Sequence, residues 1–322
     1  MTVTASLNTS PDLLTPSRLE IRPRYEGSNI CTWIGFKHVN YLVEEAVNNH
    51  LRSGGLPPGT LYEVYGLCVD IVDIDTRILH AFHIDDVAIA EVKPARKAKD
   101  GELLFSVVLQ VQRETLLKAV TSTVRVQLRH DPRGGGGEPV PATLAPYAVE
   151  RLGAVPAWEP GTPDADVNAD DLVKELTAGK NAYAWKFRIP YWYCHYTERM
   201  QMSGYLRMME EAKDRFVADR GVSIKTLLDE QNWIPVVPHS RITVLDEARM
   251  EEDLYTVFTV EEIFKGITYT SRMDTYVVRD GKLLQTSTGL ITHGYAVIEN
   301  RRDWSLVNFD DRMNAALEGR SA

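Results

Sequence analysis

Apolar residues recur every three to four positions in two long segments of this chain, a spacing typical of amphipathic helices. The segments cover residues 40–56 and 204–222, and each ends in a glycine followed by an aliphatic residue, as many helices do. The pattern predicts one long helix in each segment. The apolar positions are Val39, Leu42, Val43, Ala46, Val47 and Leu51 in the first, and Tyr205, Leu206, Met209, Ala212 and Phe216 in the second.

The two helices belong to an internal repeat. Glu44, Glu45 and Ala46 recur as Glu210, Glu211 and Ala212, an offset of 166 residues from position 44 to position 210. A repeat of this length predicts two copies of one supersecondary unit, each covering the apolar face of the other. Further identical pairs at the same offset are Arg22 and Arg188, Tyr25 and Tyr191, and Gly55 and Gly221.

Runs rich in β-branched and aromatic residues follow each predicted helix, and residues 124–128 alternate strictly between apolar and polar side chains, as in a half-buried strand. A short extended run precedes each helix. We therefore predict a strand, a long helix and four antiparallel strands, repeated once. The predicted later strands are 62–74, 78–92, 103–113 and 116–128 in the first copy, and 233–245, 254–265, 267–279 and 282–299 in the second.

The composition changes between the two copies, where glycines and prolines accumulate. We expect a flexible N-terminus over 1–18, a first unit over 19–130, a linker over 131–182, a second unit over 183–303 and a tail over 304–322. The four glycines 134–137 should be the most mobile part of the linker, because no apolar residue in that run anchors them. Residues 168–177 should form a short helix, and a second one should lie in the tail.

With 322 residues, 44% of them hydrophobic and 25% charged, the chain is typical of a globular protein. A net charge of −9 and a pI near 5.5 argue against nucleic acid as a partner. The three cysteines fit neither a zinc site nor a disulfide framework, which favours the cytoplasm. The chain contains no run of 18 apolar residues, so the sequence predicts no membrane span.

The segment from Tyr205 to Ala212, Tyr-Leu-Arg-Met-Met-Glu-Glu-Ala, resembles the central-helix signature Tyr-Leu-Arg-Trp-Phe-Glu-Glu-Ala of the hydroxybenzoyl-CoA thioesterase-like superfamily. Residues 40–56 resemble the first-domain helix of acyl-carrier-protein thioesterases. This resemblance implies an α+β double hotdog, in which one continuous antiparallel sheet wraps two central helices. It also implies hydrolysis of an acyl-CoA or acyl-carrier-protein thioester by an activated water, with no metal and no cofactor.

The resemblance implies site residues at the start of each central helix. A backbone N–H near Phe36 or Met202 would polarise the thioester carbonyl. Seventeen positions before the alanine of each Glu-Glu-Ala, the family places an acidic or amide residue, and this chain has Asn29 and His195 there. Neither is the aspartate of the hydroxybenzoyl-CoA enzymes, although related thioesterases of enediyne pathways have an asparagine at this position.

A second subfamily uses a helix glutamate, which corresponds to Glu211 or Glu45 here. His195 suits general-base work because an unperturbed histidine has a pKa near 6.5. Cys194 is adjacent to His195, but neighbouring residues of an extended run point apart, so we do not expect a Cys-His nucleophile. Tyr193 lies in the same aromatic run and is a candidate substrate contact.

His38 and Asn40 resemble the His-Val-Asn of acyl-carrier-protein thioesterases, but we expect them to cap the helix rather than to do chemistry. Glu198 is a candidate substrate contact or a charge that complements the second helix dipole. Taken together, the sequence predicts a working site at the start of the second helix, with His195 as base and the backbone near Met202 as donor.

Two alternatives remain open from the sequence. A hotdog dehydratase or hydratase would need a histidine of one unit facing a carboxylate of the other, and His38 with Glu211 or His195 with Glu45 could supply it. The Asp-x-Asn-Pro-x-His motif of hydratases is missing, however. A thioester-binding protein without catalysis is the other alternative, because both units lack the aspartate. Whether the whole chain forms a homodimer also stays open.

Overall fold

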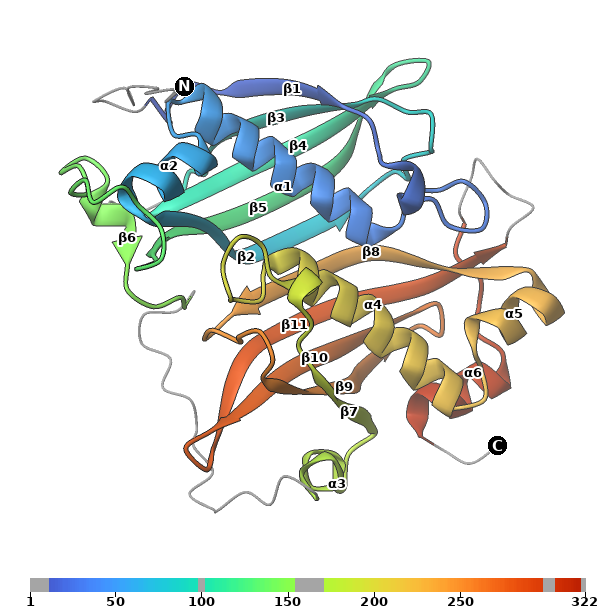
Figure 1. Ribbon diagram of the computed structural model, residues 1–322. Helices are drawn as coiled ribbons and strands as arrows, with labels where there is room; N and C mark the ends of the chain where they lie inside the picture. Colours follow the sequence, from blue (N-terminus) through green and yellow to red (C-terminus); the bar gives the residue numbers. More distant parts are fainter. Residues whose placement is uncertain (1–11, 98–101, 154–170, 298–304, 320–322) are drawn as a thin grey trace.

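The structure is a computed structural model that describes residues 12–97, 102–153, 171–297 and 305–319 (Figure 1). The helices are α1 (Phe36–Ser53), α2 (Pro58–Tyr65), α3 (Leu172–Thr177), α4 (Met202–Asp219), α5 (Ile224–Gln231) and α6 (Asp311–Glu318). The strands are β1 (Ser17–Ile21), β2 (Leu67–Ile78), β3 (Ala88–Pro94), β4 (Leu103–Gln112), β5 (Leu116–His130), β6 (Ala148–Val149), β7 (Ala182–Arg188), β8 (Trp233–Val244), β9 (Asp253–Phe264), β10 (Thr268–Arg279) and β11 (Lys282–Val297).

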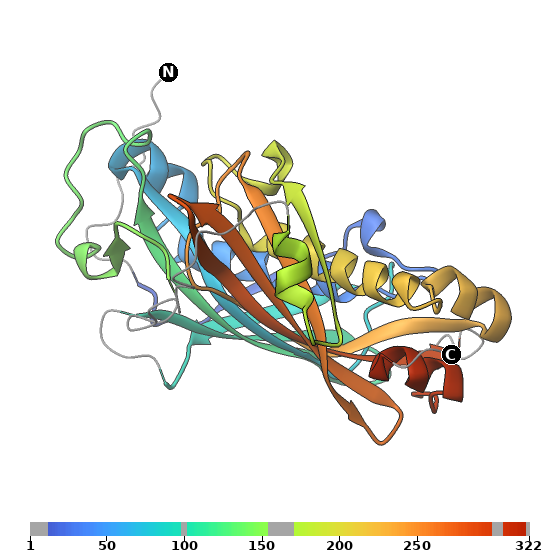
Figure 2. The same ribbon diagram turned by 90° about the horizontal axis from the view of Figure 1, so that it is seen from below.

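All eleven strands of the described part form one sheet, and its main path runs in the order β1-β3-β4-β5-β2-β8-β11-β10-β9-β7. The two halves of this path mirror each other, because β1 corresponds to β7, β3 to β9, β4 to β10, β5 to β11 and β2 to β8. The long helices α1 and α4 lie side by side on the same face of the sheet and contact each other (Figures 1 and 2). This confirms the predicted architecture of two central helices on one continuous sheet.

The offset of 166 residues holds for elements as well as for residues. It relates α1 to α4, and it also relates α2 to α5 and β2 to β8 without any shift. The sequence analysis missed α2 and α5, and it placed residues 62–65 in a strand. The ends of α2 and α5 carry sequence signals that predict a helix. Pro58 is at the first position of α2, and the left-handed residues Gly66 and Asn232 end α2 and α5.

The halves join where β2 and β8 pair in antiparallel fashion, and we call this the seam. Asp75 is the register partner of Arg241, which is also its equivalent in the repeat, so a local twofold axis passes between them. Side chains reinforce the pairing, since His239 Nε2 lies 2.8 Å from Asp75 Oδ1 and Arg241 Nη2 donates to Asp73 Oδ2 at 2.8 Å. The seam removes the free sheet edge that a single unit would expose.

One detail of the sequence prediction is wrong, and a second stays a prediction. The strand predicted over 78–92 is limited to β3, because residues 79–87 turn between β2 and β3 and Asp86 accepts a hydrogen bond from the His83 backbone. The glycine run is also anchored, since the N–H of Gly134 donates to the Asp131 carbonyl and the N–H of Gly136 donates to the Val64 carbonyl. Its high mobility stays a prediction, as does the assignment of 131–182 as a linker.

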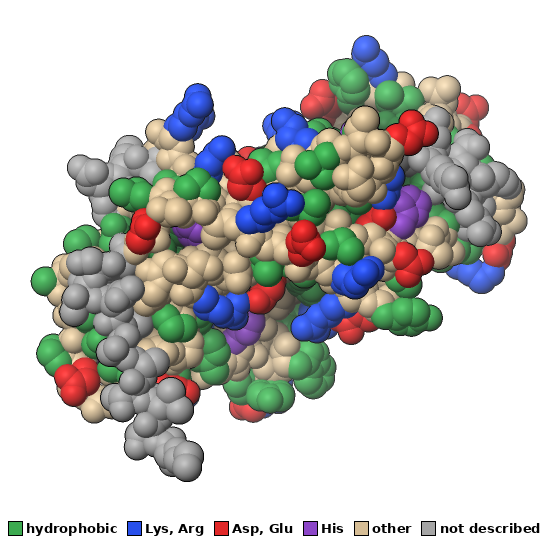
Figure 3. Space-filling model, turned by 90° about the horizontal axis from the view of Figure 1, so that it is seen from above, with side chains coloured by type: hydrophobic (Ala, Val, Ile, Leu, Met, Phe, Trp, Pro, Cys, Tyr) green, Lys and Arg blue, Asp and Glu red, His purple; other side chains and the backbone are tan. Residues whose placement is uncertain are grey.

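Other predictions fall partly outside the described residues: 1–11 of the N-terminus, 154–170 of the linker with the predicted cap Asn168, and both ends of the tail. The short helix α3 begins at Leu172, and α6 lies in the tail as expected. No helix within the described ranges is long and apolar enough to cross a membrane. On the face shown in Figure 3, basic and acidic side chains are interspersed, so this face carries no broad basic surface.

Candidate active site

Each central helix begins at a cavity whose opposite wall is the central helix of the other unit. The first, the α1-start cavity, has a volume of about 1100 Å³ and is lined by residues 28–30 and 33–37, by α4, and by α5 and β8. The second, the α4-start cavity, has about 510 Å³ and is lined by residues 195–197, Ser203 and α1. The two cavities are related by the repeat, and the chemistry of their walls differs.

The start of α1 is open to its cavity. Gly35 is the N-cap residue, and it has no side chain that could accept from the first turn. Within the described part of the chain, the N–H groups of Phe36 and Lys37 have no hydrogen-bond partner. The first turn therefore presents two free donors and the positive end of the helix dipole to whatever occupies the cavity.

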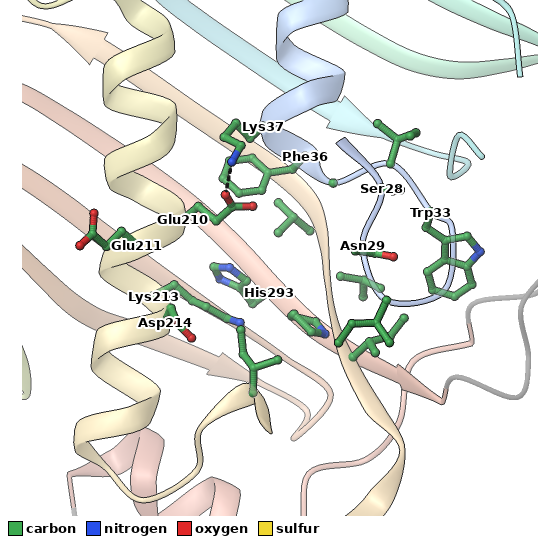
Figure 4. A pocket seen from close by; sticks show the side chains of 18 of the residues that line it. Ser28, Asn29, Trp33, Phe36, Lys37, Glu210, Glu211, Lys213, Asp214 and His293 are labelled. Carbon is green, nitrogen blue, oxygen red and sulfur yellow. Dashed lines mark hydrogen bonds and ion pairs between the residues drawn. The ribbon is translucent and has the colours of Figure 1, made fainter. Parts of the chain in front are cut away.

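Glu210 of α4 reaches across to this open helix start. Its Oε2 accepts a hydrogen bond from Lys37 Nζ at 2.5 Å, and a methyl group placed on Gly35 would lie 3.9 Å from its Oε1 (Figure 4). The two residues of this ion pair come from different units, so the pair forms only when the units are assembled. Glu211, the glutamate predicted from the sequence, instead accepts from Arg215 Nε at 2.8 Å.

The inner wall of the α1-start cavity holds a buried lysine and a buried histidine. Lys213 of α4 is 3% exposed and His293 of β11 is 2% exposed. Burial lowers the pKa of Lys213 to about 8, and burial together with the nearby Lys213 cation lowers that of His293 well below its usual value. Figure 4 shows the Lys213 amine directed away from α4 toward the cavity, with the His293 ring between Lys213 and Glu210.

In the α4-start cavity, the structure brings the predicted His195 close to a carboxylate of α1. His195 Nε2 lies 3.7 Å from Glu44 Oε1. Partial desolvation lowers the pKa of His195, whose side chain is 46% exposed, and burial raises the pKa of Glu44 to about 7. The predicted Glu45 is instead paired with Arg52 at 2.7 Å, with about half of each side chain exposed. No cluster of three or more metal-ligating side chains occurs among the described residues.

Comparison with known proteins identifies the fold. No protein-family model and no curated protein matches the sequence. In the structure comparison, a Lactobacillus plantarum protein provisionally described as an oleoyl thioesterase has a TM-score of 0.56 at 10% identity, covering 87% of this chain and 96% of that chain. The 12:0-ACP thioesterase from Umbellularia californica has a TM-score of 0.56 at 9% identity, with the same coverage. An acyl-ACP thioesterase from Bacteroides thetaiotaomicron has a TM-score of 0.51 at 7% identity, covering 86% and 97%.

The chain has a double-hotdog fold. At identities of 7–10% these matches identify the fold alone, so the reaction is argued from the cavities of this double hotdog.

The structure distributes the other predicted residues between the two cavities and the core. Asn29, Phe36 and Tyr193 line the α1-start cavity, and His38 lines the α4-start cavity. The Asn29 carboxamide oxygen accepts from the backbone N–H of Cys31 at 3.3 Å, which holds the loop before α1. The predicted pairs His38 with Glu211 and His195 with Glu45 do not form, because His38 instead lies 3.4 Å from Glu26 and His195 lies beside Glu44.

Three predicted contacts have structural roles in this double hotdog. Asn40 is fully buried, and it donates to the Phe36 carbonyl at 2.9 Å and accepts from Thr76 Oγ1 at 2.7 Å, which ties α1 to the sheet. Glu198 pairs with Arg133 at 2.7 Å. Met202 is 3% exposed and packs in the core, so only its backbone could face a ligand.

The sequence analysis missed Glu44, Glu210, Lys213 and His293. Lys213 carried a usable signal, because it occupies an apolar position of its helix and its repeat equivalent is the buried Val47. A helical wheel at about 100° per residue also places Glu210 at the border of the apolar face and Glu211 on the opposite side. Nothing in the local sequence around His293 distinguishes it from a packing residue.

The raised pKa of Glu44 leads to a test of stability. Folding favours its protonated form, so the free energy of unfolding should fall as the pH rises from the unfolded-state value of 4.5 to the folded-state value of about 7. Glu44→Gln removes the charged carboxylate that lowers the free energy of unfolding at high pH. It should therefore raise the melting temperature clearly at pH 8 and little at pH 4.5.

Glu45→Gln is the matched control, because Glu45 is the next residue of α1 and lies at the surface. It should change the melting temperature little at either pH. An equal gain for Glu44→Gln at both pH values would contradict the raised pKa of Glu44.

Proposed function

We propose that the protein hydrolyses an acyl thioester in the α1-start cavity. The observation that carries this proposal is the Glu210 carboxylate beside the open start of α1, across a cavity of about 1100 Å³. Thioester hydrolysis needs a donor for the developing oxyanion and a base for the attacking water, and these two groups face each other here. The shared fold with acyl-ACP thioesterases supports the same reaction.

In the proposed reaction, the thioester carbonyl oxygen accepts hydrogen bonds from the N–H groups of Phe36 and Lys37. Glu210 holds a water and takes its proton as the water oxygen bonds to the carbonyl carbon. The negative charge that develops on the carbonyl oxygen is stabilised by the two donors and by the α1 dipole. When the carbon–sulfur bond breaks, Glu210 returns the proton to the departing sulfur, which yields a carboxylic acid and a thiol.

The ion pair with Lys37 gives Glu210 a fixed orientation. The Lys37 side chain is 19% exposed and that of Glu210 is 47% exposed, so water can reach the carboxylate while the lysine stem is held by the protein. This proposal uses Phe36, which the sequence predicted as a donor, and it assigns the base to Glu210 rather than to His195. The working site thus moves from the start of α4 to the start of α1.

The proposal is tested by incubating the full chain with a panel of acyl-CoA and acyl-carrier-protein thioesters and identifying the products by mass spectrometry. Release of free acid and free thiol supports hydrolysis, and the preferred carrier distinguishes a CoA substrate from a carrier protein. Absence of turnover on the whole panel would refute it in favour of a thioester-binding protein.

A second candidate function is the dehydration or hydration of an acyl thioester in the α4-start cavity. The observation that favours it is the 3.7 Å approach of His195 to Glu44, a histidine of one unit beside a carboxylate of the other. With a pKa near 7, Glu44 can give and take a proton at neutral pH. The same panel separates the two reactions, since hydroxyacyl thioesters would then give enoyl thioesters with the carrier still attached.

A further inference from the structure

Lys213 and His293 form a polar end to a cavity whose neighbouring wall is apolar. The apolar wall comes from α5 and β8 and consists of Ile224, Leu228, Ile234, Pro235, Val236 and Val237. A lysine that is 3% exposed at such a place has lost most of its hydration, and burying an unpaired charge is costly. The cavity therefore suits an alkyl chain that ends in a polar group.

Few groups within the protein compensate the charge of the buried Lys213 amine. Among the described residues its amine forms no hydrogen bond or ion pair. The contact found for its charge is a cation–π contact with the Tyr295 ring, whose centroid lies 5.7 Å away. Two carboxylates act on Lys213 through their charges: Glu210 pairs with Lys37, and Asp214 lines the same cavity but is exposed and forms no ion pair with Lys213 among the described residues.

His293 offers a second group at the same place. Its Nδ1 is buried and has no hydrogen-bond partner in the described part of the structure, while its ring stacks on Tyr269 at 5.3 Å between centroids. The stack fixes the ring, and His293 lines the cavity, so a ring N–H that is directed into the cavity can donate to a ligand there. An ammonium and an imidazole N–H together match one carboxylate with two oxygens.

We propose that the substrate is an acyl thioester whose acyl chain ends in a carboxylate, which Lys213 and His293 bind at the inner end of the α1-start cavity. The proposal rests on the proposed hydrolysis, and it names the class of acyl group. The alkyl part of the chain lies along the apolar wall of α5 and β8, and the thioester lies at the start of α1 beside Glu210. The phosphates of CoA stay outside, because both binding groups are almost fully buried.

The test compares CoA thioesters of straight chains ending in a carboxylate with methyl-ended chains of the same length, over a series of lengths. The native protein should prefer a carboxylate end by roughly 10- to 100-fold in kcat/KM, as expected for hydrogen bonds to a charged group. Lys213→Met, which keeps the length of the side chain, should abolish or reverse this preference.

Lys225→Met is the matched control, because Lys225 also lines the cavity, yet it is 76% exposed and paired with Asp229. It removes the same charge from the cavity and should leave the preference unchanged. Equal rates on both substrate series with the native protein would overturn the proposal. So would a Lys213→Met variant that loses kcat equally on both series, since the lysine would then act in the reaction itself.

A binding measurement separates failure of this proposal from failure of the proposed function. The free dicarboxylic acids should raise the melting temperature of the native protein and not that of Lys213→Met, whether or not any thioester is hydrolysed. If no thioester is turned over but this shift occurs, hydrolysis is refuted and the carboxylate site stands. If thioesters are turned over and no shift occurs at any chain length, the carboxylate site is refuted.

Discussion

Glu210→Gln should lower kcat for thioester hydrolysis by about 10² to 10⁴-fold, the range typical for the loss of a general base. The amide keeps the size of the side chain and its contact with Lys37, but it cannot take a proton from water. The KM should change little, because the donors at the start of α1 remain. Steady-state kinetics on the best thioester of the panel measures both constants, and the melting temperature checks that the variant is folded.

Two variants serve as controls for this experiment, one from the repeat and one from the neighbouring position of α4. Glu44→Gln changes the equivalent residue in the α4-start cavity, and Glu211→Gln changes the neighbouring residue of α4, which pairs with Arg215. Both should keep kcat within a few-fold of the native value. If Glu44→Gln loses activity while Glu210→Gln keeps it, the reaction occurs in the α4-start cavity, and His195 becomes the next residue to test.

Arg199→Met should destabilise the protein by about 3–5 kcal/mol, the range measured when one partner of a buried ion pair is removed. Arg199 is 4% exposed and precedes α4 in the second unit. Its guanidinium donates to Asp70 Oδ2 at 3.1 Å, in the first unit, and to Asp131 Oδ2 at 3.0 Å, directly after the last strand of that unit. Without it, the buried Asp131 and the partly buried Asp70 lose their common partner. Urea unfolding followed by circular dichroism measures the change.

Arg188→Met is the control for this prediction. Arg188 pairs with Glu251 at 2.7 Å, but the two side chains are 62% and 65% exposed, so its loss should cost at most about 1 kcal/mol. A similar small loss for Arg199→Met would show that water replaces the guanidinium and that the triad does not hold the units together.

The architecture could be predicted from the sequence because its determinants are local and occur twice. The apolar spacing of α1 and α4 and the shared Glu-Glu-Ala placed two helices at one offset, and the alternating runs placed the strands around them. Missing α2 and α5 did not change the topology, because each only leads from a central helix into the next strand.

The candidate site could be predicted only in part, because it is built between the units. The sequence indicated the start of α1 through Phe36, and it indicated a helix glutamate, but it selected Glu211 where the structure presents Glu210. Both glutamates line the cavity, but which of them reaches the start of α1 depends on the rotation of α4 against α1, and this rotation is set by packing that spans both units. His293 comes from β11 and Lys213 from α4, and the two line one cavity only in the folded chain, so no spacing in the sequence joins them.

The charges of the seam also determine which halves can assemble. If two first units met through β2, the register of the seam would place Asp75 opposite Asp75, and two second units meeting through β8 would place Arg241 opposite Arg241. Like charges directly opposite each other destabilise a strand pair, whereas the mixed pair sets Asp75 against Arg241. Separately expressed halves should therefore avoid self-association and recognise each other, so that cutting the chain between them would yield an obligate heterodimer.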